Sequence, residues 1–160
     1  MVNQLFSSDL IYLDYEASDA FDFLNKINIE LVNKNIVMPT YLDAIIEREK
    51  KYPTGLPSQP FPVAIPHGDP EHVIRPCIVV VRPTTPIEFG EMGTDDKTVA
   101  AKYIFMLVVK KVSNQITLLQ SMIDMFMDEN AMGELDSANT SEQIMEVLQK
   151  YIIYREEETI

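Results

Sequence analysis

The stretch CIVVV at residues 77–81 decides the fold class of this chain, and the run IFMLVV at 104–109 points to the same class. Both stretches are apolar at consecutive positions instead of at alternate ones. Continuous apolar runs of this length are typical of strands that are covered on both faces of a sheet. Shorter runs at 10–13 and 63–65 predict two further strands of the same sheet.

A fifth strand is predicted at residues 87–89, after the turn PTTP at 83–86, as a short edge strand paired in a hairpin. Helices are predicted on either side of the strand region, where apolar residues recur at helical spacing. They are expected over residues 17–33, from about 38 to before Pro53, from Ser113 to Phe126, and from Thr140 to Tyr151. These elements predict a single α/β domain over residues 1–160, a sandwich with a mixed sheet of about five strands and helices on both faces.

The ends and faces of these helices are predicted from individual side chains. Thr40 is expected to cap the second helix and Ser113 the third, and Thr140 with Gln143 forms a capping box for the last. The first helix should bury Ala20, Leu24, Ile27 and Leu31, and the third should bury Ile116, Leu119, Met122 or Ile123, and Phe126.

Composition excludes several classes of function. Thirteen Lys and Arg against 25 Asp and Glu give a net charge of −12, which disfavours binding to nucleic acid. No apolar run reaches the ~20 residues that span a bilayer, and the N-terminus lacks the pattern of a signal peptide. Cys77 is the only cysteine, so no internal disulfide forms and a reducing cytoplasm is expected.

The middle of the chain is rich in loops, because all ten prolines lie between Pro39 and Pro86. There, the segment VAIPHG at 63–68 places His67 directly after a strand, and such loops often carry functional residues. A neutral imidazole is a nucleophile near pH 7, and Gly68 would let another molecule approach it. The alternative is a loop histidine with both ring nitrogens hydrogen-bonded, and these residues alone favour that alternative.

The wider segment carries a family resemblance. The order ERE at 47–49, YPTG at 52–55 and VAIPHG at 63–68 resembles the enzyme IIA family of the bacterial sugar phosphotransferase system, in its fructose–mannitol class. That family has an arginine in a helix, then a Thr-Gly turn, then an apolar strand ending in Ala-x-Pro-His and a small residue. The resemblance runs from the first predicted helix to the last. It is closest to the galactitol-specific branch, through YPTG, His72 and RPT at 82–84.

This resemblance implies a phosphotransferase that relays a phosphoryl group. A phosphohistidine of the small histidine phosphocarrier protein would transfer its phosphoryl group to His67. His67 would pass it to a cysteine of enzyme IIB, and the membrane enzyme IIC would take up the sugar alcohol, with galactitol the expected one. The alternative is a regulatory module of the same fold, in which phosphorylation of His67 controls a partner protein.

Two further site residues follow from the resemblance. Arg48 matches the family arginine that faces the phosphoryl group, and its spacing from Tyr41 and Ile45 directs it inward. The alternative for Arg48 is a solvated side chain on a charged helix face. Gln115 stands where mannitol- and fructose-type members have a second histidine. Its amide can donate a hydrogen bond to phosphate but cannot carry charge, and an exposed polar residue is the alternative.

No metal and no organic cofactor are expected. The spacing of His67, His72 and Cys77 matches no zinc pattern, and Asp95 and Asp96 are expected to be solvated loop residues. A hydrolase that uses His67 as a general base is disfavoured, because no Gly-x-Ser-x-Gly motif is present.

Overall fold

Five strands form one mixed sheet in the computed structural model, which describes residues 5–110 and 112–152. The strand order is β1-β4-β7-β3-β2, with β4 parallel to β1 and antiparallel to β7, and β3 parallel to β7. The strands are β1 Ile11–Tyr15, β2 Gly55–Leu56, β3 Val63–Ala64, β4 Cys77–Pro83 and β7 Tyr103–Val108. The predicted mixed sheet of five strands is confirmed, but its fifth member is β2, which was not predicted, and not the strand expected at 87–89.

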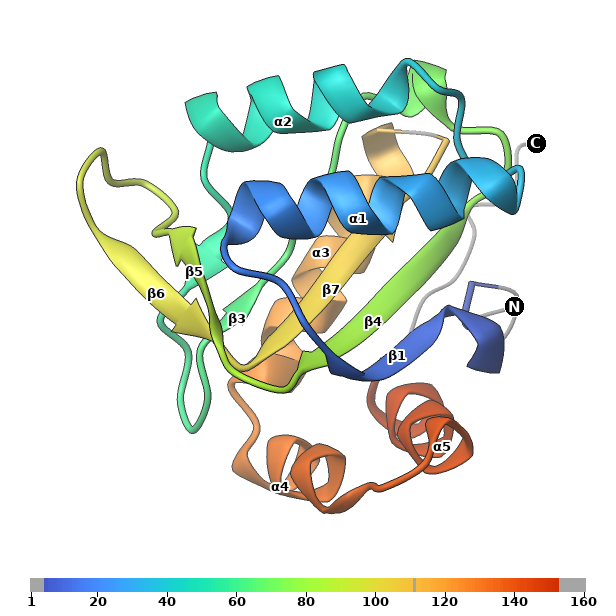
Figure 1. Ribbon diagram of the computed structural model, residues 1–160. Coiled ribbons are helices and arrows are strands. Elements are labelled where there is room, and N and C mark those ends of the chain that lie inside the picture. The colour runs from blue at the N-terminus through green and yellow to red at the C-terminus, as the bar shows by residue number, and fades with distance from the viewer. Residues whose placement is uncertain (1–4, 111, 153–160) are drawn as a thin grey trace.

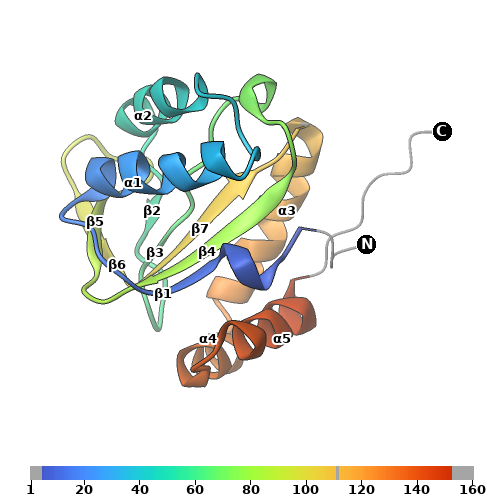
Figure 2. The same cartoon turned by 45° about the vertical axis from the view of Figure 1, so that its right-hand side comes forward.

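Helices cover both faces of this sheet, as predicted (Figures 1 and 2). Helices α1 Ala20–Asn33 and α2 Tyr41–Lys51 lie on one face. Helices α3 Val112–Phe126, α4 Glu129–Ser137 and α5 Ser141–Tyr151 lie on the other. Two short 3₁₀ helices, η2 Ser8–Leu10 and η3 Pro70–His72, precede β1 and β4.

Strands β4 and β7 are buried on both faces, which is why their sequences are continuously apolar. Ile78 and Val80 belong to the core under α3, α4 and α5, whereas Val79 and Val81 belong to the core under α1 and α2. Truncating such a buried side chain to alanine typically costs about 2–5 kcal/mol. The central strands therefore support both layers of the fold at once.

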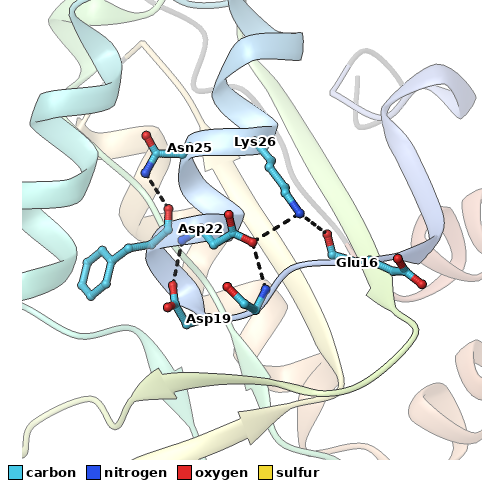
Figure 3. Close-up of polar contacts among 7 residues, drawn as sticks. Glu16, Asp19, Asp22, Asn25 and Lys26 are labelled. Atoms are coloured by element: carbon cyan, nitrogen blue, oxygen red, sulfur yellow. Dashed lines mark hydrogen bonds and ion pairs between the residues drawn. The ribbon is translucent and has the colours of Figure 1, made fainter.

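An acidic pair caps helix α1 at its N-terminus (Figure 3). The Asp19 carboxylate accepts a hydrogen bond from the backbone N–H of Asp22 at 2.8 Å, and the Asp22 carboxylate accepts one from Ser18 N–H at 2.9 Å. Lys26 Nζ lies 3.3 Å from Asp22 and donates to the carbonyl of Glu16 at 3.1 Å. Negative charge at this end complements the helix dipole, and such a cap typically contributes about 1 kcal/mol.

The predicted hairpin at residues 87–89 has a different partner. Strand β5, Ile87–Gly90, pairs with β6, Thr98–Ala101, in a separate two-stranded antiparallel sheet. The hairpin turn is therefore the segment that contains Asp95 and Asp96, not the turn at 83–86. Strand β6 was missed because it buries only small apolar residues, Val99 and Ala101, at alternate positions.

Two helix predictions need correction. Thr40 does not cap α2, because its hydroxyl lies 2.8 Å from His72 Nδ1 and makes no capping hydrogen bond. In α3, Ile116 is 66% exposed, and from Ile116 onward the buried residues are Leu118, Met122, Met125 and Phe126. The phase of the apolar stripe was ambiguous because α3 is apolar on more than one face.

Three further helix N-termini have different outcomes. Thr140 caps α5 by accepting a hydrogen bond from Gln143 N–H, which confirms that cap. Helix α4 was not predicted, although Asp128 caps it through Asn130 N–H and Ala131 N–H. The predicted cap Ser113 has a side chain outside the described part of the structure.

Candidate functional site

His67 lies just beyond the end of strand β3, in a segment that still runs beside β7. The backbone of His67 forms an isolated parallel bridge with Leu107, and Leu107 N–H donates to the carbonyl of Pro66 at 3.0 Å. The side chain of His67 is half-buried. The pairing with β7 therefore fixes the point at which the His67 side chain leaves the sheet.

One ring nitrogen of His67 has a defined role. Nδ1 lies 2.8 Å from the carbonyl oxygen of Ile65. A carbonyl oxygen only accepts hydrogen bonds, so Nδ1 carries the hydrogen in the neutral ring and Nε2 holds the lone pair. This tautomer makes Nε2 the nucleophilic atom.

The surroundings of His67 keep the ring neutral. Burial lowers the pKa of His67, the positive charge of Arg48 lowers it further, and the hydrogen bond to Ile65 opposes both. A histidine with a lowered pKa is neutral at pH 7, as a nucleophile must be.

Gly68 serves a different purpose from the one predicted. A Cβ on Gly68 would lie 3.1 Å from the ring of Tyr41 and 3.4 Å from Cβ of Ile45, both on helix α2. The missing side chain therefore lets the loop pack against α2, and the expected approach route over Gly68 is occupied by the protein itself.

Arg48 lies in the last turn of α2 and is half-buried. Its guanidinium carbon stands 5.6 Å from the centre of the Tyr52 ring. Its Nε is buried and has no hydrogen-bond partner among the described residues. Over the same residues no carboxylate lies within ion-pair distance of Arg48, so its charge is available to an anion beside His67.

The neighbour of Arg48 is a buried carboxyl group that sequence reasoning treated as surface charge. Glu49 is only 4% exposed, and it accepts hydrogen bonds from Thr54 N–H at 3.0 Å and from Thr54 Oγ1 at 2.9 Å. Burial raises the pKa of Glu49 to about 7, although the Thr54 hydrogen bonds oppose the shift. The available signal was the spacing of Tyr41, Ile45 and Glu49, which are the three buried residues of α2.

The Thr-Gly turn joins this carboxyl group to the strand that carries the histidine. The carbonyl of Thr54 accepts a hydrogen bond from Ile65 N–H at 3.2 Å. A Cβ on Gly55 would lie 2.6 Å from the carbonyl oxygen of Gly90 in β5, so glycine is required there. The turn is therefore clamped between the β5–β6 hairpin and the segment leading to His67.

The other predicted site residues are placed as follows. Gln115 lies in the first turn of α3, and its side chain is outside the described part of the structure. His72 contacts Thr40 through Nδ1 at 2.8 Å and Glu71 through Nε2 at 3.3 Å, so it anchors η3 to the start of α2.

Of the three residues whose spacing matches no zinc pattern, Cys77 is a core residue. Cys77 is buried in β4, and burial raises the pKa of its thiol to about 12, as befits a small apolar core residue. A different set brings ligand atoms within 4.8 Å of one another: Asp69, Glu71 and His72. Both carboxylates of that set are exposed.

Comparisons with known proteins identify the family of this chain. Residues 4–151 match the family described as phosphoenolpyruvate-dependent sugar phosphotransferase system, EIIA 2. The chain is 28% identical over 139 residues to the galactitol-specific EIIA component of Escherichia coli strain K12, which covers 87% of this chain and 91% of that protein.

Two solved structures share the fold. One is the Escherichia coli mannitol IIA in its complex with phosphorylated mannitol IIB, with a TM-score of 0.70, 22% identity, and coverage of 91% of this chain and 97% of that one. The other is the nitrogen regulatory protein IIA-Ntr of Neisseria meningitidis, with a TM-score of 0.71, 20% identity, and coverage of 92% and 98%. Among the described residues, no helix has the length and apolar character needed to cross a membrane.

Proposed function

Because this chain belongs to the EIIA 2 family of the phosphoenolpyruvate-dependent sugar phosphotransferase system, we propose that His67 is the residue that carries its phosphoryl group. The chain is thus a phosphotransferase component of that system. The observation that carries the assignment is the hydrogen bond from His67 Nδ1 to Ile65, which leaves the lone pair on Nε2, without a hydrogen-bond partner among the described side chains, in the field of the Arg48 cation.

The proposed reaction has two steps. In the first, Nε2 of His67 attacks the phosphorus of a phosphohistidine on the phosphocarrier protein. The new P–N bond forms while the old one breaks, and the electron pair returns to the carrier's imidazole. In the second, a cysteine thiolate of enzyme IIB attacks the same phosphorus, and His67 regains its neutral ring.

The residues around His67 support both steps. The hydrogen on Nδ1 stays on the ring throughout, and the Ile65 carbonyl stabilises the positive charge that the phosphorylated ring carries. Arg48 contributes the cation that offsets the phosphoryl oxygens, because the transition state spreads negative charge over three of them. Gln115, in the first turn of α3, is proposed to donate a further hydrogen bond to the phosphoryl group.

The proposed partners are the histidine phosphocarrier protein and an enzyme IIB, with the membrane enzyme IIC downstream and the cytoplasm as the site of action. Galactitol is the proposed sugar alcohol, on the strength of the galactitol-specific relative. The likeness to IIA-Ntr leaves a regulatory role as the second candidate. Transfer to a panel of enzyme IIB proteins separates the two, since rapid transfer to the galactitol IIB alone supports transport.

The test of His67 uses pre-phosphorylated phosphocarrier protein and intact-mass measurement at alkaline pH, which preserves phosphohistidine. We expect one phosphoryl group on the wild type and on His72→Ala, and none on His67→Ala. A chelator should leave the transfer rate unchanged. Phosphate retained on a folded His67→Ala protein would refute the assignment.

A further inference from the structure

A chain of hydrogen bonds connects the Glu49 carboxyl group to the imidazole of His67. Glu49 accepts from both donors of Thr54, the Thr54 carbonyl accepts from Ile65 N–H, and the Ile65 carbonyl accepts from His67 Nδ1. Every link after the first uses the backbone. We propose that Glu49 is a positioning residue, which holds Thr54 and thereby fixes the Ile65 carbonyl that orients His67.

The segment before His67 pairs with β7 on one side and has only short strand pairing on the other side. Strands β2 and β3 pair through only two residue pairs, Gly55 with Ala64 and Leu56 with Val63. The bond from Ile65 N–H to Thr54 extends that pairing by one step toward His67. Thr54 therefore holds the last residues before the imidazole on the side away from β7.

A buried carboxyl group is a costly way to fill space. Glu49 and Thr54 are 4% and 2% exposed, and Thr54 supplies the hydrogen bonds that the Glu49 carboxyl accepts in the described structure. Apolar side chains of similar volume are often at least as stabilising at such a position, because no polar group has to leave water. We therefore explain the buried pair of Glu49 and Thr54 by its role in positioning the segment that carries His67.

The placement on α2 links both requirements of the site. Arg48 and Glu49 are adjacent, so the same helical turn presents a cation toward His67 and an anchor toward the loop that carries His67. A change in the helix would move both groups together. Thr54 and Glu49 thus keep the imidazole aligned with Arg48.

This inference rests on His67 being the phosphoryl carrier, but its structural readout does not. Nitrogen NMR of the imidazole reports which ring nitrogen carries the hydrogen, with His67→Ala used to assign the signals of the two histidines. We expect the Nδ1–H form in the wild type and in Glu49→Gln, since the Gln amide oxygen can still accept from Thr54. In Glu49→Ala we expect a mixture of both tautomers.

Single-turnover transfer from phosphorylated carrier provides the kinetic readout. We expect Glu49→Gln to stay within about 3-fold of the wild-type rate, and Glu49→Ala to fall by about 10- to 100-fold, the loss that misplacing a reacting group can cause. Met132→Ala, which truncates a buried side chain of α4, is the matched control for lost stability. Its rate should equal that of the wild type at temperatures where all variants are folded.

The outcomes separate the two proposals. Wild-type tautomer and rate in Glu49→Ala, or a rate loss equal to that of Met132→Ala, would overturn the positioning role. If Glu49→Ala does not fold, Thr54→Val replaces it, because it removes only the hydroxyl that reaches Glu49, and the same two results decide. A wild-type protein that is phosphorylated elsewhere than His67 refutes the proposed function, whereas the tautomer measurement still judges Glu49.

Discussion

Charged groups at the two ends of the central strands β4 and β7 differ in whether they have hydrogen-bond or ion-pair partners. At the start of β7 and the end of β4, the charged groups of Arg82, Lys102 and Asp136 each have a partner. Arg82 donates to the carbonyl of Ala138 at 2.7 Å, Tyr103 donates to Asp136 at 2.6 Å, and Lys102 lies 3.0 Å from Asp136. This closed network ties helix α4 to the sheet.

At the other end, next to Leu107, the polar groups are left open. Among the described side chains, Arg48 has a buried Nε without a partner, and His67 makes a hydrogen bond through Nδ1 alone. Closed polar networks add rigidity, whereas an unpaired buried donor costs about 1–3 kcal/mol. Of these two ends, the molecule accepts this cost at the one where an incoming anion would relieve it.

The largest expected effect comes from removing the open cation. Arg48→Ala should slow phosphoryl transfer by about 10³-fold, because charge stabilisation by an arginine is worth that much or more in such reactions. Arg48→Lys should recover only part of the rate, since a point charge cannot make the two-pronged contact. Single-turnover transfer to enzyme IIB measures both, after circular dichroism and melting curves show that the variants are folded. A near wild-type rate in Arg48→Ala would make Arg48 a plain surface residue.

The next effect concerns stability and pH. The pKa of Glu49 is raised to about 7, so the folded protein keeps a proton that the unfolded chain loses near its ordinary pKa of 4.5. Stability contributed by this group is therefore present below about pH 4.5 and is lost as the pH rises toward 7, by about 2–3 kcal/mol. Urea unfolding of Glu49→Gln against the wild type between pH 4.5 and 8 measures it. Parallel curves for the two proteins would contradict the prediction.

A smaller effect is expected at the closed end. Arg82→Ala removes a charged hydrogen bond to Ala138, and we expect a loss of about 1–2 kcal/mol in the free energy of unfolding. The rate of phosphoryl transfer should remain within twofold of the wild type, because the network lies at the far end of the strands from His67. A large rate loss at unchanged stability would show that the two ends are coupled.

The smallest effect is a shift in the titration of His67. Burial and then Arg48 lower its pKa below the ordinary 6.5, so the neutral ring prevails down to that pH. We expect the transfer rate to change less than twofold between pH 8 and 6.5 and to fall at lower pH, as the ring becomes protonated. In Arg48→Ala the NMR titration midpoint of His67 should move up, since one of the lowering influences is gone. An unchanged midpoint would place Arg48 too far away to act.

Local patterns in the sequence were enough for the layered fold. The runs at 77–81 and 104–109 became β4 and β7, because continuous apolar sequence has no stable place except between two covering layers. Strand β6 and helix α4 escaped prediction, since their buried residues are few or small and their stability depends on partners far along the chain. The pairing of β5 with β6 instead of with β4 was not predicted for the same reason.

The same distinction between local sequence patterns and tertiary contacts applies to the site. The place of His67 at the end of a strand follows from the sequence, because the strand, the proline and the histidine are neighbours in the chain, whereas its proposed role rests on the family. Glu47 and Glu49 are chemically identical and flank the same arginine, yet Glu47 is exposed and Glu49 is buried against Thr54. Gly68 likewise faces Tyr41 instead of an incoming partner. Only tertiary structure decided these positions, because the phase of a helix and the packing of a loop are set by contacts between segments that the sequence does not place side by side.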